Sequence, residues 1–408
     1  MLDLLNKAIN QAKNTNMYSG KLKDLDLIFS LKDFLKIPFT TKSDLREAYP
    51  YGTLAVNFHE VVEVHMTSGT TGKPTLSFFT KSDLLNSNEY ISKAWKNFGI
   101  DKSSKIQFMM SYGLFSGAPL NSYAIQHIGG FVMPSGIQPT QKQVELLRDF
   151  QIDIIVATPS YFLHLYDFLQ KNKISLASLN IRKGIAAGEA YSDEMKAKIA
   201  KMFNIRLYDH YGLCEVNTGI IYECDKCEEM VVLKDYVYAE VVDPQTGVNL
   251  AIGETGELVL TATMKDASPI LRYKTGDAAS IVSYSSDCTG CKGSMLISRI
   301  KGRIDSIIFY KGLKIDPYEL KDFVFIISED KIYNRIKIIV NEKQDQMSKT
   351  ITIRVSTKPG VNDFAFKVDL EKNIQEKIKV PVRVELVSYD YFEEFNTTKV
   401  KLVEHIYE

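Results

Sequence analysis

The stretch from Met66 to Thr75, MTSGTTGKPT, combines five hydroxyl side chains with two glycines and one lysine. Gly69 and Gly72 can adopt backbone angles that are closed to other residues. A flexible loop rich in N–H and O–H donors, with Lys73 as its cation, suits the phosphates of a nucleotide. It is not the P-loop of NTPases, because only two residues separate its glycines and Pro74 follows the lysine. Taken alone, a loop of this composition is more often an ordinary surface turn.

Three further segments carry groups that nucleotides use. The segment Tyr211–Glu215, YGLCE, offers a strand-end tyrosine that can stack on a base and a carboxylate that can hold Mg²⁺. In Arg272–Asp277, RYKTGD, a carboxylate follows a glycine turn and can accept ribose hydroxyls. The small residues of Gly184–Glu189, GIAAGE, permit a planar ligand to approach, although tight helix–sheet packing explains them equally well. Without further context, Glu215 and Asp277 are ordinary surface acids.

Four of the five cysteines form two CxxC pairs, Cys224 with Cys227 and Cys288 with Cys291. Two such pairs in a reducing compartment predict a structural zinc site with four thiolate ligands. The stretch between the pairs is longer than in a zinc ribbon, so its strands and turns must bring the pairs together. The alternative is two unrelated thiol pairs.

Together and in this order, the motifs resemble those of the acyl-adenylate-forming ligases, which include acyl-CoA synthetases, peptide-synthetase adenylation domains and luciferases. Residues 38–56, PFTTKSDLREAYPYGTLAV, look more specifically like the phenylacetate–CoA ligase branch. The resemblance implies a two-step reaction with ATP and Mg²⁺. A carboxylic acid, aryl or small, attacks the α-phosphate to give an acyl-adenylate, and coenzyme A or the phosphopantetheine of an acyl carrier protein then takes the acyl group.

The resemblance also implies roles for individual residues. Tyr211 would stack on adenine, Glu215 would hold the magnesium ion and act in catalysis, and Asp277 would bind the ribose. Cys214 stands where the family usually has Thr or Ser, which leaves open whether a hydroxyl contact is lost. The implied acyl pocket consists of Tyr112, Phe115, Ala186 and Cys214. The implied ATP-binding residues are Ser68, Gly69, Thr70, Thr71, Gly72, Lys73, Ala187, Gly188, Glu189, Tyr211, Gly212, Asp277 and Arg303.

Two positions late in the chain matter for the order of the two steps. By resemblance, Lys399 is the catalytic lysine of adenylation, although Lys401 is close enough to take its place. One well-placed cation is what chemistry at a developing negative charge requires. The run KGRID resembles the family's GRxD motif, so that Arg303 would reach the ribose or phosphates and Asp305 would be the hinge.

Composition narrows the class of protein. The chain has 408 residues, of which 45% are hydrophobic and 25% charged, as in globular proteins. Fifty basic and fifty acidic residues cancel, so nothing in the net charge favours nucleic acid or an anionic membrane as a partner. The N-terminal MLDLLNKAINQAKN predicts an amphipathic helix and not a signal peptide, and no apolar run spans a bilayer. We therefore expect a cytoplasmic protein, and the sequence leaves a homodimer open.

The order of strand-like and helical patterns predicts an α/β protein with two main domains. From residue 61 to 222, apolar runs alternate with helical patterns, which predicts a parallel sheet flanked by helices. Short strands and turns dominate residues 223–300, a β-rich subdomain that contains the cysteine pairs. We therefore expect an N-terminal adenylate-forming domain in residues 1–302 and a small mobile α/β domain in residues 303–408.

Two alternatives remain at the level of sequence. The ligase could transfer its acyl group to an amine or stop at the adenylate. A protein of another class, a nucleotide-binding regulator without ligase chemistry, is kept open by Thr398 and Cys214, where the family has other residues. Pyrophosphate exchange stimulated by a carboxylic acid separates an enzyme from a binding protein.

Overall fold

The computed structural model describes residues 1–67, 72–300, 302–310, 313–328, 331–342, 349–361, 364–392 and 402–407. The chain divides into two compact units. The first consists of Met1–Tyr161, Leu165–Glu189 and Ala200–Arg299. The second consists of Phe162–His164, Ala190–Ile199 and Ile300–Glu408.

One mixed sheet of eleven strands forms the framework of the first unit. Five strands at one end pair in parallel, and the others pair with antiparallel neighbours. Short apolar runs such as Ile154–Ala157 are buried along their whole length, as expected for a parallel strand covered on both faces. The order across the sheet is β10 (Val237–Val242), β11 (Thr255–Ala262), β12 (Tyr273–Ser283), β13 (Met295–Ile297), β9 (Met230–Val232), β8 (Asn217–Glu223), β7 (Arg206–Leu213), β6 (Lys183–Ala187), β5 (Ile154–Ala157), β3 (Lys105–Phe108) and β4 (Phe131–Met133).

The antiparallel hairpin of β7 and β8 joins the two parts of this sheet. The β-rich segment expected from the sequence is thus present, but its strands continue the parallel sheet instead of forming a separate layer. Gly212 lies within the hairpin, where an added Cβ would come 2.4 Å from Thr218 Cα. The close approach of the two strands therefore requires glycine at this position. Tyr211 and Glu215 flank it, so the hairpin fixes where both side chains emerge.

Several helices of the first unit begin at a residue whose side chain caps the helix, among them α2, α3, α4, α5 and α8. The helix α5 begins after Thr80, whose hydroxyl accepts from Asp83 N while the Asp83 carboxylate accepts from Thr80 N, a capping box. Trp95 on this helix is fully buried. The helices are α1 (Leu2–Ala12), α2 (Asn16–Ser19), α3 (Leu31–Phe34), α4 (Lys42–Glu47), α5 (Lys81–Asn97), α6 (Gly117–Ile128), α7 (Thr140–Asp149), α8 (Pro159–Lys171) and α9 (Asp193–Phe203), the last two partly counted with the second unit.

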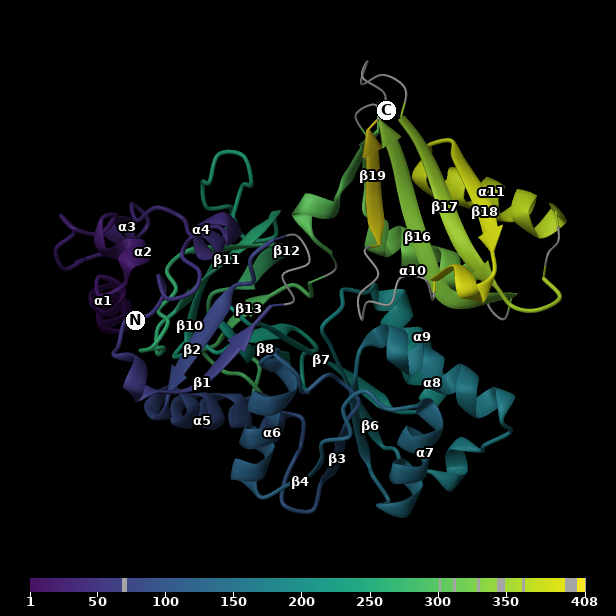
Figure 1. Ribbon diagram of the computed structural model, residues 1–408, viewed down its shortest axis with the longest axis horizontal. Helices are drawn as coiled ribbons and strands as arrows, with labels where there is room; N and C mark the ends of the chain where they lie inside the picture. The colour runs from purple at the N-terminus through teal and green to yellow at the C-terminus, as the bar shows by residue number, and fades with distance from the viewer. Residues whose placement is uncertain are drawn as a thin grey trace. The chain divides into compact units, whose positions relative to one another are not determined.

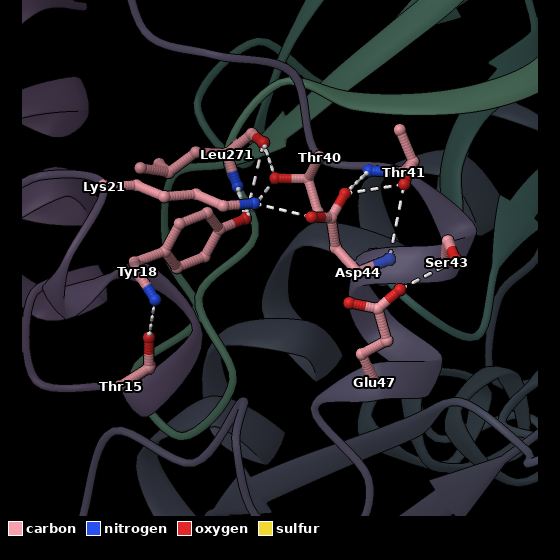
Figure 2. A network of polar contacts seen from close by, with 9 residues as sticks. All are labelled: Thr15, Tyr18, Lys21, Thr40, Thr41, Ser43, Asp44, Glu47 and Leu271. Atoms are coloured by element: carbon pink, nitrogen blue, oxygen red, sulfur yellow. Dashed lines mark hydrogen bonds and ion pairs between the residues drawn. The ribbon is translucent and has the colours of Figure 1, made fainter.

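The N-terminal helices are tied to the large sheet by a buried hydroxyl network (Figure 2). The Tyr18 and Thr40 hydroxyls lie 2.6 Å apart, and Thr40 donates to the Leu271 carbonyl oxygen at 2.7 Å. The Leu271 N–H donates to the Tyr18 hydroxyl at 2.9 Å, and burial raises the pKa of that phenol to about 12. On the same segment Lys21 pairs with Asp44, which also caps α4. The first sixty residues thus brace the strand that carries the RYKTGD motif.

The second unit contains a smaller α/β sheet (Figure 1). Its four strands lie in the order β18 (Val382–Val387), β17 (Lys349–Thr357), β16 (Ile332–Glu342) and β19 (Val403–Tyr407). The helices α10 (Pro317–Ser328) and α11 (Phe364–Ile378) pack on β16 and β18, respectively. A short antiparallel pair, β14 (Ile308–Tyr310) and β15 (Leu313–Ile315), precedes them. No helix among the described residues is both long enough and apolar enough to span a lipid bilayer.

Candidate active site

The base of the expected phosphate loop is held by two threonines. The loop connects β1 (Val61–Met66) to β2 (Leu76–Thr80), which pair in antiparallel fashion. Thr67 N donates to the Thr75 carbonyl oxygen at 3.1 Å, and Thr75 N donates to the Thr67 hydroxyl at 3.1 Å. The residues Ser68, Gly69, Thr70 and Thr71 lie outside the described residues. The two hydrogen bonds between Thr67 and Thr75 therefore hold the two ends of this loop together.

Two loop residues on the β2 side are described. Gly72 has φ +141°, a conformation that side-chain-bearing residues rarely adopt, and, its two chain neighbours aside, no atom of the other described residues lies within 4 Å of where its Cβ would stand. The Lys73 ammonium lies 5.9 Å from the centre of the Tyr49 ring. The lysine is exposed, so its charge is accessible to a ligand.

Glu215 is linked directly to the base of this loop. Its carboxylate accepts a hydrogen bond from the Thr75 hydroxyl at 3.1 Å and a longer one from the Tyr273 hydroxyl at 3.4 Å. The side chain is buried, with 6% of its surface exposed. Thr75 and Glu215 are 140 positions apart in sequence, so only the fold brings them together. A buried carboxylate with hydroxyl neighbours is a donor set that suits a hard cation such as Mg²⁺.

Tyr211 and Asp277 are also neighbours. The Tyr211 hydroxyl donates to the Asp277 carboxylate at 2.6 Å. Asp277 is buried, and its N–H donates to the Thr275 hydroxyl at 3.0 Å, directly after Gly276 with φ +77°. The structure therefore places a stacking ring beside a carboxylate, which is the pair of groups that a nucleoside can use. Their roles in binding stay predictions.

The GIAAGE segment ends β6 and turns toward α8. Ala186 is fully buried, and Gly188 takes φ +82°. The Glu189 carboxylate accepts from Ser160 N at 3.2 Å and from the Ser160 hydroxyl at 2.8 Å, at the first turn of α8. A side chain at position 188 would come 3.2 Å from the end of Met110. The segment is thus anchored by a helix cap, a contact that sequence reasoning missed.

The residues expected around the acyl group are mostly neutral and half-buried. The Tyr112 hydroxyl lies 2.5 Å from that of Ser122, and burial raises its pKa to about 12. Burial also raises the pKa of the Cys214 thiol to about 12, while a hydrogen bond with Ser116 acts in the opposite direction. Cys214 is therefore a neutral thiol at physiological pH and not a thiolate nucleophile. Phe115 is half-buried in the loop before α6.

Lys265 is a buried cation in the same part of the molecule, and the sequence analysis did not single it out. It is 2% exposed, and burial lowers the pKa of its ammonium to about 8. The ammonium donates to the Ser77 hydroxyl on β2 and to the Glu215 carbonyl oxygen, the latter at 3.2 Å. Nothing in the surrounding sequence, TMKDASP, distinguishes a buried lysine from a solvated one.

The four paired cysteines come together at the β8–β9 and β12–β13 connections. Their sulfur atoms all lie within 4.8 Å of one another. Cys224 and Cys288 have sulfurs 3.9 Å apart, and the sulfurs of Cys227 and Cys291 are 3.7 Å apart. These distances are far longer than a disulfide bond. The cluster joins the two ends of the β-rich segment without covalent cross-links.

The residues expected to matter for the order of the two reaction steps lie only partly within the described part of the chain. Arg303 and Asp305 form a two-point ion pair, with both nitrogen–oxygen distances 2.9 Å, in and beside the short 3₁₀ turn Ile304–Ser306. Asp305 is 61% exposed. Lys399 and Lys401 lie outside the described residues, as do Lys311 and Gly312, which stand between β14 and β15 in the sequence and are considered below with the proposed hinge.

Comparison with known proteins shows the class of enzyme to which this chain belongs. Residues 25–264 match the model of the AMP-binding enzyme family. The fold resembles the crystal structure of 2-hydroxyisobutyryl-CoA ligase in the postadenylation state, with a TM-score of 0.86 at 20% identity, over 99% of this chain and 88% of that one. The chain belongs to the AMP-binding, acyl-adenylate-forming enzymes.

Its relatives place it in one branch of that class. It is 34% identical over 331 residues to the phenylacetate-coenzyme A ligase of Pseudomonas putida, covering 81% of this chain and 74% of the relative. It is 32% identical over 330 residues to the Escherichia coli K12 enzyme of the same name, covering 80% and 74%. The chain belongs to the phenylacetate–CoA ligase-like branch. It is an AMP-forming acid–thiol ligase, which activates a carboxylic acid as an acyl-adenylate and transfers it to a thiol.

Proposed function

We propose that this ligase makes the coenzyme A thioester of an aryl or small organic acid. The observation that carries the proposal is the contact of the phosphate-loop base with Glu215, through the 3.1 Å hydrogen bond from Thr75. The 2.6 Å hydrogen bond of Tyr211 with Asp277 adds a ring and a carboxylate that a nucleoside can use. The names of the relatives, phenylacetate-coenzyme A ligases, support an aryl acid and coenzyme A.

The residues divide the task as follows. Glu215 holds Mg²⁺ on ATP, and the chemistry that the ion supplies is neutralisation of phosphate charge. Tyr211 stacks on adenine, Asp277 accepts the ribose hydroxyls, and the loop of residues 68–73 covers the phosphates. Cys214 and Tyr112 line the acyl pocket with neutral groups, which suits an apolar acyl chain. The substrate carboxylate is its own nucleophile, so alignment and charge neutralisation account for catalysis.

The test is pyrophosphate exchange with a panel of carboxylic acids that includes phenylacetate, benzoate, acetate and 2-hydroxyisobutyrate. We expect an aryl acid to stimulate exchange and Glu215→Gln to abolish most of it. Adding coenzyme A, a pantetheinylated carrier protein or an amine then identifies the acceptor. Nucleotide binding without exchange by any acid would instead favour a regulatory binding protein.

We propose Lys399 as the lysine that stabilises the adenylation transition state. Lys399→Ala should abolish exchange while leaving thioester formation from a supplied acyl-adenylate largely intact, because the second step needs no cation at that phosphate. Lys401→Ala is the matched control, two positions away. If Lys401→Ala has this effect and Lys399→Ala does not, the assignment moves by two residues.

We propose that the cysteine cluster holds one structural Zn²⁺. A tetrahedral site with Zn–S bonds of about 2.3 Å needs sulfurs about 3.8 Å apart. Two of the six sulfur pairs lie 3.7 and 3.9 Å apart, which supports this geometry. Metal analysis of protein purified without added zinc should give about one equivalent, and Cys227→Ser with Cys288→Ser should remove it. Finding no metal in protein whose four thiols all react freely would reject the site.

We propose that residues 303–408 act as a mobile domain that presents Lys399 for adenylation and then turns about Asp305. The loop Lys311-Gly312-Leu313-Lys314 would approach the thiol in the second step. The exposure of Asp305 supports a hinge, because a pivot residue must change its backbone angles without losing buried contacts.

A further inference from the structure

The buried ammonium of Lys265 needs an explanation beyond stability. Removing a charge from water is costly, and a neutral side chain of similar size would avoid that cost. Lys265 lies in the connection from β11 to β12, with its nitrogen 4.7 Å from the centre of the Phe79 ring. The negatively charged groups Asp83 and Glu215 lie close enough to favour its charged form.

Two contacts connect this cation to the proposed magnesium site from one side. Its ammonium donates to the hydroxyl of Ser77 on β2, two positions after Thr75. It also donates to the backbone carbonyl oxygen of Glu215 at 3.2 Å. The Glu215 backbone is therefore tied to β2 through Lys265.

A second connection links the same two elements. The hydroxyl of Thr75, the residue directly before β2, donates to the Glu215 carboxylate at 3.1 Å. These contacts form a closed ring. It runs from Lys265 to Ser77, along the chain to Thr75, across to the Glu215 carboxylate, and from the Glu215 backbone back to Lys265. A closed path with one contact on the Glu215 backbone and one on its carboxylate fixes the direction of that side chain, which a single hydrogen bond would not do.

We propose that Lys265 is a positioning residue that holds Glu215 and the β2 end of the phosphate loop in the orientation that binds the magnesium–nucleotide complex. The inference rests on the proposed role of Glu215. Lys265 contacts Glu215 through the backbone carbonyl and not through the carboxylate, so its loss should weaken magnesium binding more than it slows turnover once the site is filled.

The experiment measures pyrophosphate exchange at fixed ATP over a range of free Mg²⁺. Lys265→Met should raise the Mg²⁺ concentration for half-maximal exchange about tenfold or more, with the rate at saturating Mg²⁺ reduced about threefold or less. Lys265→Gln, which keeps a donor without the charge, should fall between wild type and Lys265→Met. Lys183→Met is the matched control, because that lysine also donates to a backbone carbonyl, that of Phe98 at 2.6 Å, at the opposite end of β6 from Gly188.

A double-mutant cycle carries the test if Lys265→Met does not fold. Ser77→Ala and Thr75→Val each remove one connection between β2 and Glu215, and we expect their effects on Mg²⁺ activation to be non-additive. An unchanged Mg²⁺ dependence in Lys265→Met with lowered thermal stability, or strict additivity of Ser77→Ala and Thr75→Val, would overturn the inference. Glu215→Gln separates it from the proposed function, since normal Mg²⁺ activation in that variant would reject the role of Glu215 itself.

Discussion

Two arginine–carboxylate pairs, both involving arginines of recognisable motifs, have opposite environments. Arg272 of RYKTGD is 4% exposed and meets Glu240 through two hydrogen bonds of 3.1 and 2.9 Å. Its guanidinium also donates to the Ile37 carbonyl oxygen at 2.7 Å and lies 4.0 Å from the centre of the Phe39 ring. Arg303 of the KGRID run pairs with Asp305 at the surface, where the two side chains are 33% and 61% exposed.

The difference separates residues that serve the fold from those available for function. The Arg272 guanidinium donates to Glu240 of the large sheet and to the Ile37 carbonyl oxygen of the N-terminal segment. This arginine therefore has a structural role. Asp305 is exposed and Arg303 is half-buried, so this pair is far more solvated than that of Arg272, as a ligand contact and a hinge would require. Presence in a motif therefore does not by itself indicate contact with substrate.

The largest effect should come from breaking the buried pair. Arg272→Met leaves the Glu240 carboxylate buried without its partner and should cost about 3–5 kcal/mol of unfolding free energy. Burial already raises the pKa of Glu240 against the opposing effect of Arg272. Urea unfolding measures the loss, and the double variant Arg272→Met with Glu240→Leu should recover much of it. A loss below about 1 kcal/mol would show that the pair is not structural.

Another interior polar group sharpens the comparison through pH. His210 is buried, with its ring 5.4 Å from that of Trp95 and 5.7 Å from that of Phe98, and burial lowers its pKa to about 4. The unfolded chain, with a histidine pKa near 6.5, binds the proton first as pH falls. This contribution to stability is complete above about pH 6.5 and declines by about 1.4 kcal/mol per pH unit toward pH 4.

Urea unfolding of wild type and His210→Phe at pH 7, 6 and 5 checks this. The variant should lack this part of the decline, although other groups will still titrate. Parallel pH dependence in the two proteins would mean that the imidazole is protonated equally in the folded and unfolded states.

A smaller effect is expected at the exposed pair, and only in one reaction step. Asp305→Pro fixes φ near −65° and should slow thioester formation about tenfold more than pyrophosphate exchange, because it restricts the proposed rotation. Asp305→Ala, which removes the same carboxylate but leaves the backbone free, is the control. Equal slowing of both steps in protein with a normal melting curve would place the pivot elsewhere.

The smallest effect concerns stability at the same place. Arg303→Gln should change the free energy of unfolding far less than Arg272→Met does, by about 1 kcal/mol or less, because a solvated ion pair contributes little. Its proposed contact with ribose or phosphates should nevertheless raise the KM for ATP. Chemical denaturation measures the change in stability, and steady-state kinetics on the same preparation measures the KM for ATP. A large loss of stability without a change in KM would reverse the contrast with Arg272.

The sequence by itself determined the family and the α/β class. It could do so because glycine turns, apolar runs and CxxC pairs are local patterns with local physical causes. The helical patterns of residues 141–150 and 192–203, for example, correspond to α7 and α9. The motifs also identified Glu215, Tyr211 and Asp277 as candidate site residues, but they did not show which protein groups these side chains contact.

Only the tertiary structure decided how distant residues meet. Ser77 and Lys265 are 188 positions apart, and the contact between Thr75 and Glu215 spans 140. No local pattern marks Lys265 as buried or Arg272 as structural, because a charged side chain has the same sequence signature whether it is solvated or paired in the interior. Burial depends on which strands become neighbours in the sheet, and that pairing is a property of the whole chain.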